Sequence, residues 1–147
     1  MGLEGKNIAG SAWLLLFFAW LVATVATIGS LFFSEVMMFP PCVMCWYQRI
    51  FMYPLVIMLL IALFISDTKV TPYALALSLG GLFFAIYHNL LYYKILPESA
   101  QPCSQGVSCT SDYINWFGFI TIQFLSLVAF LLITVSLILF KQKVKKL

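Results

Sequence analysis

Four long stretches of the chain carry no aspartate, glutamate, lysine or arginine: 7–34, 50–66, 70–93 and 113–140. A helix needs about 20 mostly apolar residues to cross a bilayer, and all four stretches approach or exceed that length. Only 9% of the 147 residues are charged, whereas soluble domains carry about 25%. We therefore expect an all-α membrane protein in which residues 1–147 form a single four-helix transmembrane domain. Its spans should lie near 12–33, 47–66, 72–93 and 117–140.

Lysine and arginine are distributed unevenly between the two sides of these spans. With four spans, both termini and the turn at 67–71 face the same side of the membrane. That side carries Lys6, Lys69, Lys141, Lys143, Lys145 and Lys146, and the other side carries only Arg49 and Lys94. Because segments rich in lysine and arginine stay in the cytoplasm, we expect both termini to be cytoplasmic.

All four cysteines are extracytoplasmic in this topology. Cys42 and Cys45 lie in the first loop, and Cys103 and Cys109 lie in the second, within "KILPESAQPCSQGVSCTSDYINW". Disulfides persist outside the reducing cytosol, so both pairs can oxidise there. Because the two loops share one face of the membrane, the pairs can also meet.

Three interpretations of the cysteine pairs are open. Structural disulfides are the first, although closing a loop as short as 103–109 stabilises the fold by only about 2 kcal/mol in the entropy model. A zinc site is the second, for which C-x2-C is a common half and C-x5-C an unusual one. A thiol–disulfide relay is the third. It is favoured because a C-x2-C disulfide opens and re-forms readily by thiolate attack.

The surroundings of the first pair also favour the relay. Pro40-Pro41 cannot continue a helix, so Cys42 and Cys45 should fall at the start of the second span. A helix N-terminus stabilises a thiolate. Arg49 lies one turn beyond Cys45 on roughly the same face. The alternative for this arginine is that it reaches the headgroups and has no chemical role.

His88 is the only histidine and the only ionisable residue well inside a span. An ionisable group within the membrane is by default a candidate for function. The alternative is a structural hydrogen bond between helices. Gly80 and Gly81, about two turns earlier, indicate close helix packing.

The segment "PPCVMCWYQR" resembles the C-V-x-C-x-Y-x-R signature of the DsbB/BdbC family of bacterial disulfide-bond formation proteins. The four spans, the order of the two cysteine pairs and the segment "FGFITIQFLSLVAF" agree with that family over essentially the whole chain. The short C-x5-C spacing is similar to its Gram-positive branch. The vitamin K epoxide reductase family has the two pairs in the reverse order. Gln123 stands where the family pattern has a proline.

The resemblance implies a quinone-linked oxidase of the bacterial cell membrane. Cys42 and Cys45 match the quinone-proximal pair, with Cys45 next to the quinone ring, and Arg49 matches an arginine that contacts the quinone. Cys103 and Cys109 match, by their order, the pair that faces a thioredoxin-fold oxidase outside the cytoplasm. His88 is a counterpart of a quinone-site histidine.

On this basis we expect electrons to pass from a reduced partner to Cys103–Cys109, then to Cys42–Cys45, and then to a menaquinone or ubiquinone. Neither a metal nor a nucleic acid is expected. The competing hypothesis is a small structural membrane protein whose disulfides fix its two loops.

Overall fold

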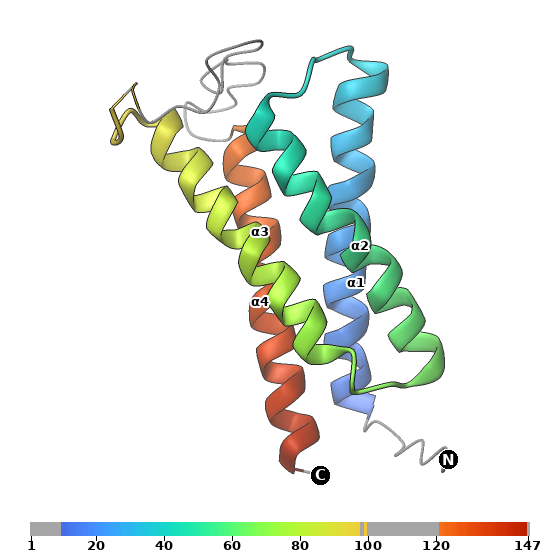
Figure 1. The fold of residues 1–147 in the computed structure, drawn as a ribbon. Coiled ribbons are helices and arrows are strands. Elements are labelled where there is room, and N and C mark those ends of the chain that lie inside the picture. The colour runs from blue at the N-terminus through green and yellow to red at the C-terminus, as the bar shows by residue number, and fades with distance from the viewer. Residues whose placement is uncertain (1–9, 98, 100–120, 147) are drawn as a thin grey trace.

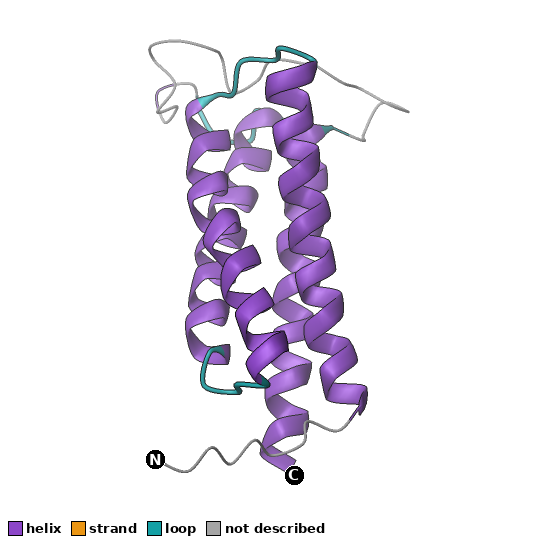
Figure 2. Ribbon diagram, turned by 90° about the vertical axis from the view of Figure 1, so that its right-hand side faces the viewer, coloured by secondary structure: helices purple, strands orange, loops and turns teal. Residues whose placement is uncertain are grey.

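The computed structural model describes residues 10–97, 99 and 121–146, and this part of the chain forms four antiparallel helices (Figure 1). The helices are α1 (Gly10–Leu31), which continues into the π-helical segment η1 (Phe32–Val36), α2 (Val43–Ile65), α3 (Thr71–Tyr92) and α4 (Ile122–Lys146). Each is long and apolar enough to cross a membrane. Within the described residues only helices and loops occur (Figure 2). The expected four-helix membrane bundle is confirmed.

The helices pass up and down through the bundle. The start of α1, the turn between α2 and α3 and the end of α4 lie at one end, and the α1–α2 connection lies at the other (Figure 1). α1 packs against α2 and α4, and α3 packs against the same two helices. The bundle is therefore a closed ring of four.

Two helix boundaries differ from the sequence-based expectation. α2 begins at Val43, four residues before the expected start at 47, because Cys42 caps the helix. α4 continues to Lys146 rather than ending near 140, because lysine favours the helix and the backbone hydrogen bonds need no apolar surroundings. The expected start of the fourth span at 117 lies outside the described residues.

Small residues allow the helices to approach closely. α1 buries Ala12, Ala19 and Ala23 along one face. On α3, a Cβ atom added to Gly81 would overlap the ring of Phe130 on α4. Without a hydrophobic force between helices in lipid, such close backbone contact supplies much of the packing energy.

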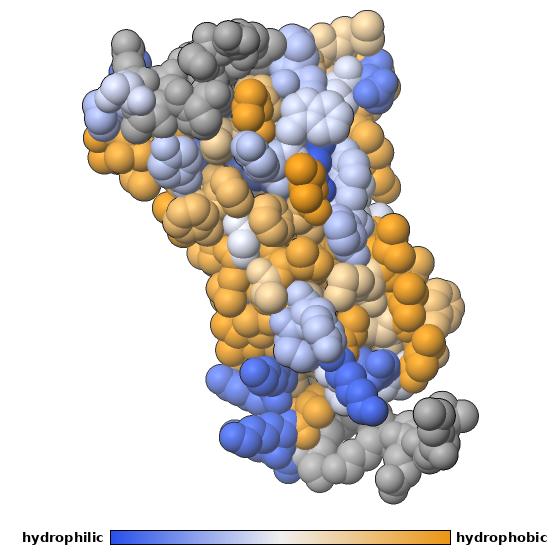
Figure 3. All heavy atoms as spheres, in the orientation of Figure 1, coloured by the Kyte–Doolittle hydropathy of each residue, from blue (hydrophilic) through white to orange (hydrophobic). Residues whose placement is uncertain are grey.

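The outer surface of the bundle is apolar at mid-height, and hydrophilic residues gather where α4 ends (Figure 3). Exposed side chains on this surface include Val25, Ile57, Phe64 and Phe83. Such a belt is suited to lipid and would be a liability in water.

Candidate functional site

The N-terminus of α2 carries the first cysteine pair. Pro40 and Pro41 precede the helix in non-helical conformation, and Cys42 is its N-cap. The Cys42 sulfur accepts a hydrogen bond from the Cys45 backbone N–H at 3.4 Å, which is the role that a serine or aspartate plays at many helix starts. Both cysteines therefore lie at the positive end of the helix dipole, where a thiolate is stabilised.

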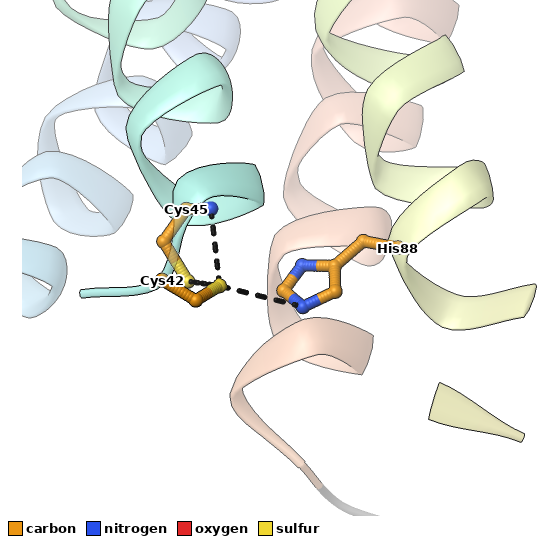
Figure 4. Close-up of side chains that lie close together, drawn as sticks. All are labelled: Cys42, Cys45 and His88. Carbon is orange, nitrogen blue, oxygen red and sulfur yellow. Dashed lines mark hydrogen bonds between the residues drawn. The ribbon is translucent and has the colours of Figure 1, made fainter. Parts of the chain in front are cut away.

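His88 of α3 completes a cluster of three side chains with this pair (Figure 4). The sulfurs of Cys42 and Cys45, both free thiols here, are 2.9 Å apart. The His88 ring points toward them, and its Nε2 lies 3.8 Å from the Cys42 sulfur. His88 is only 1% exposed. Two helices thus bring together residues that are 46 positions apart in the chain.

The cluster lowers the pKa of the Cys42 thiol to about 4, chiefly because the Cys45 thiol donates a hydrogen bond to the Cys42 sulfur. Burial acts in the opposite direction, and the hydrogen bond and charge of His88 add to the lowering. Cys42 is therefore the sulfur of the pair that carries the negative charge in the reduced form.

Gln48 holds the far side of the histidine ring. Its amide nitrogen lies 3.4 Å from His88 Nδ1, and the side chain is buried at 8% exposure. This contact directs Nε2 toward Cys42. The sequence analysis missed Gln48, although its position three residues after Cys45 places both on one helical face.

Arg49 is held inside the bundle by α1. Its Nε donates to Ser30 Oγ and its Nη2 donates to the Ser30 carbonyl, both at 2.9 Å. The guanidinium also lies over the Trp46 ring, 5.4 Å from the centroid. Its hydrogen bonds thus go to protein, which favours a positioned arginine over one that merely reaches the headgroups. Ser30 was not foreseen, because no spacing rule relates α1 to α2.

A cavity of about 510 Å³ lies between α1, α2 and α4 next to this cluster. Its wall is mainly apolar, and its polar side chains include Ser30, Gln48, Arg49 and Tyr53. The Tyr53 hydroxyl is buried and has no hydrogen-bond partner in the described structure. Cys42 and Cys45 both border the cavity, whereas His88 does not.

Cys45, Arg49 and Tyr53 form a stripe along α2 at intervals of four residues. Residues four apart lie above one another on a helix. The stripe therefore runs along one wall of the cavity, from the helix start into the bundle.

The remaining predicted positions are placed only in part. Cys103 and Cys109 lie outside the described residues. Gln123 lies in the first turn of α4 and is buried, and its backbone carbonyl accepts hydrogen bonds from the side chains of Asn89 and Ser126. The helix thus forms here without the proline that the family pattern has.

Comparison with known proteins gives a consistent result. Residues 10–140 match the family model described as disulfide bond formation protein DsbB. The chain is 50% identical over 126 residues to disulfide bond formation protein C of Bacillus subtilis, covering 86% of this chain and 91% of that protein. It is 48% identical over 130 residues to the probable disulfide formation protein C 1 of Bacillus anthracis, covering 87% and 93%.

A relative outside Bacillus is also similar. The probable disulfide formation protein of Metapseudomonas resinovorans is 42% identical over 136 residues, which cover 92% of this chain and 94% of that protein. No solved structure gives a significant match. With its four membrane-spanning helices and its family match over residues 10–140, the chain belongs to the DsbB family of disulfide bond formation proteins.

Proposed function

We propose that this protein is a protein-dithiol:quinone oxidoreductase that supports disulfide bond formation in exported proteins. The observation that carries the proposal is the position of the Cys42–Cys45 pair. It stands at the end of the bundle and also borders an apolar cavity between three helices. A redox pair in this place can exchange with water-borne thiols on one side and with a lipid-borne oxidant on the other.

The cavity fits a quinone headgroup in size and in chemistry. Its volume of about 510 Å³ falls within the range of about 300–1,000 Å³ that is usual for small-molecule sites. Such sites combine apolar walls with a few polar groups. Here Arg49 offers charge-assisted donors, and the Tyr53 hydroxyl, which has no partner in the described part of the chain, offers a second donor one turn further along α2. Both would hold quinone carbonyl oxygens.

A bound quinone, menaquinone or ubiquinone, would supply the two-electron acceptor that returns the Cys42–Cys45 pair to the disulfide. The chain's own residues supply the exchange step. A thiolate freed in the second loop attacks the Cys42 sulfur of the oxidised pair, the Cys42–Cys45 bond breaks, and Cys45 leaves as a thiolate. Cys45 then faces the cavity beside Arg49, whose positive charge stabilises the leaving sulfur.

In this proposal His88 stabilises the thiolate of Cys42. Its Nε2 faces the Cys42 sulfur, and it does not contribute to the cavity wall. When the partner's second cysteine releases Cys103 and the Cys103 thiolate re-forms its bond to Cys109, the Cys42–Cys109 bond breaks and Cys42 leaves as a thiolate. A donor at Nε2 stabilises that charge. The contact between histidine and quinone that the family resemblance implies is not needed for this role.

The partner-facing step belongs to Cys103 and Cys109. We propose that a reduced thioredoxin-fold oxidase attacks the Cys103–Cys109 disulfide outside the cytoplasm, with Cys103 facing the partner and Cys109 facing Cys42. The lysines at the far end of the bundle support a cytoplasmic position for both termini. The start of α2 would then be extracytoplasmic, where the partner is.

A purely structural role for the first pair has less support. Cys42 and Cys45 are three positions apart at the start of one helix. A bond between them would fix no segment distant in the sequence, and a ring this small adds little to stability.

The proposal is tested by anaerobic assay of the purified protein with a reduced thioredoxin-fold dithiol protein and a short-chain quinone. Quinone reduction should match dithiol oxidation in amount, and Cys42→Ser and Cys45→Ser should each abolish it. Both variants should still accumulate in the membrane. Dithiol oxidation without quinone reduction, or full activity in either variant, would contradict the proposal.

A further inference from the structure

The cluster at the start of α2 has the donor set of a metal site. The sulfurs of Cys42 and Cys45 and a ring nitrogen of His88 all lie within 4.8 Å of one another. Figure 4 shows the three groups converging from α2 and α3. Two thiolates and an imidazole are ligands that zinc and related thiophilic cations prefer.

We propose that the reduced Cys42–Cys45 pair and His88 together bind a thiophilic divalent cation such as Zn²⁺ or Cd²⁺, and that the bound cation holds the pair in the reduced state. This inference needs only that the pair can be reduced, so it does not depend on the identity of the oxidant. The ligands differ from the four-cysteine zinc site considered from the sequence.

The distances are close to those of a coordinated ion. Zinc–sulfur bonds of about 2.3 Å and zinc–nitrogen bonds of about 2.0 Å in a tetrahedral site put ligand atoms roughly 3.5–3.8 Å apart. The separation between Cys42 Sγ and His88 Nε2 is 3.8 Å, and that between the two sulfurs is 2.9 Å. The two sulfurs must move apart to bind an ion, and a rotation of the Cys45 side chain can separate them.

Charge and burial also support binding. Two thiolates balance the charge of a divalent cation, so the filled cluster is neutral, which a buried site requires. Counted from the fully protonated dithiol, binding forms two metal–sulfur bonds and one metal–nitrogen bond and releases two protons. Three protein donors leave one position for water. The disulfide offers no thiolate, so the cation binds the reduced pair and opposes its reoxidation.

Gln48 provides the outer contact that a ligating histidine usually has. Metal-bound histidines hydrogen-bond through their other ring nitrogen, which fixes the ring orientation. The Gln48 amide lies 3.4 Å from His88 Nδ1, and Nε2 faces the Cys42 sulfur. Turning that amide by 180° presents its oxygen to an Nδ1–H, the form needed when Nε2 binds a metal.

The test uses Co²⁺, whose absorption reports thiolate coordination directly. The full-length chain with Cys103→Ser and Cys109→Ser is purified in detergent, so that only the first pair can respond. After reduction, one equivalent of Co²⁺ should give sulfur-to-cobalt charge-transfer bands and the visible bands of a tetrahedral site. Zn²⁺ should remove these bands, and the same protein in oxidised form should show none.

In that background, His88→Gln should weaken Co²⁺ binding at least about tenfold. Losing only the residue that hydrogen-bonds a metal ligand already lowers metal affinity about tenfold or more, and His88 is a ligand itself. Cys45→Ala should remove the charge-transfer bands or reduce them sharply, which provides a second variant should His88→Gln fold poorly. Met44→Leu is the matched control, since it deletes a nearby buried sulfur and should leave the affinity unchanged. Absent bands in the reduced parent, equal binding by the oxidised parent, or unchanged affinity in both ligand variants would overturn the proposal.

Discussion

The Nε2 atom of His88 lies 3.8 Å from the sulfur of Cys42. This contact links the C-terminal part of α3 to the first cysteine pair, and Gln48 lies against the other ring nitrogen of His88. The cavity also borders this pair, and Cys45, Arg49 and Tyr53 lie along its wall. The two cysteines thus have different neighbours. His88 lies beside Cys42, and Arg49 lies one turn after Cys45 along the cavity wall.

The first prediction concerns the titration of Cys42. Its pKa is lowered chiefly by the hydrogen bond from Cys45 and less by His88. A thiol with a lowered pKa keeps its thiolate as the pH falls, until the pH passes the lowered value. In the reduced chain, Cys42 should therefore still be alkylated at about pH 6, where an ordinary cysteine is almost wholly protonated.

Two variants check the causes of that shift. Cys45→Ala should raise the pKa of Cys42 most, and His88→Gln should raise it by less, so alkylation at low pH should decline in that order. The measurement is the rate of iodoacetamide labelling of the Cys42 peptide across pH, read by mass spectrometry. A pH profile identical to that of the wild type in both variants would contradict the assigned causes.

The second prediction concerns Arg49. A hydrogen bond from a charged group contributes about 1.5–3 kcal/mol, and about 1.4 kcal/mol corresponds to a tenfold change in affinity. Arg49→Gln should therefore raise the KM for quinone at least about tenfold, with a smaller effect on exchange with the partner. Ser30→Ala, which removes one contact of Arg49 but keeps the guanidinium, should have a smaller effect. Steady-state kinetics at varied quinone decide the matter, and an unchanged KM in Arg49→Gln rejects the assignment.

The third prediction concerns the hydroxyl of Tyr53. Because this hydroxyl is buried and has no hydrogen-bond partner among the described residues, Tyr53→Phe should leave the thermal stability of quinone-free protein unchanged or slightly higher. The KM for quinone should rise several-fold, since a neutral hydrogen bond contributes about 1 kcal/mol. Tyr47→Phe is the control: Tyr47 stacks on Phe84 and does not line the cavity, so neither quantity should change. Destabilisation of quinone-free Tyr53→Phe would show that the hydroxyl has a structural partner instead.

The fourth prediction concerns the contact between α3 and α4. Gly81→Ala would place a methyl group against the Phe130 ring, and overpacking of this kind costs about 1–3 kcal/mol. Unfolding in detergent should therefore occur at a lower denaturant concentration. Gly29→Ala is the matched control, because its Cβ would meet no atom of the described residues within 4 Å. Equal stability of the two variants would mean that the α3–α4 contact adjusts freely.

The four helices could be predicted because the membrane imposes a simple rule. Long uncharged segments must span it as helices whose backbone groups are paired internally. This rule depends on hydrophobicity and does not predict at which residue the backbone hydrogen bonds of a helix begin or end. The start of α2 at Val43 is therefore set by the Cys42 cap, and the end of α4 at Lys146 by helix propensity outside the apolar region.

The site was predictable only where its residues lie close together in the chain. The spacing of Cys42, Cys45 and Arg49 on α2 could be read directly as one helix face. The contact of Arg49 with Ser30 and that of His88 with Cys42 depend on how α1 and α3 pack against α2. His88 was a candidate because it is the only ionisable residue well inside a span, but only the packing shows that it faces the cysteine pair and does not line the cavity.

The central claim is that the Cys42–Cys45 pair exchanges electrons with quinone in the membrane, and thiol trapping of the isolated pair tests it most directly. The full-length chain with Cys103→Ser and Cys109→Ser is reduced, freed of reductant under anaerobic conditions, and treated with a thiol-alkylating reagent with and without added quinone. We predict that Cys42 and Cys45 become a disulfide when quinone is present and stay fully alkylated when it is absent. A redox state of this pair that is the same in both samples would contradict the account.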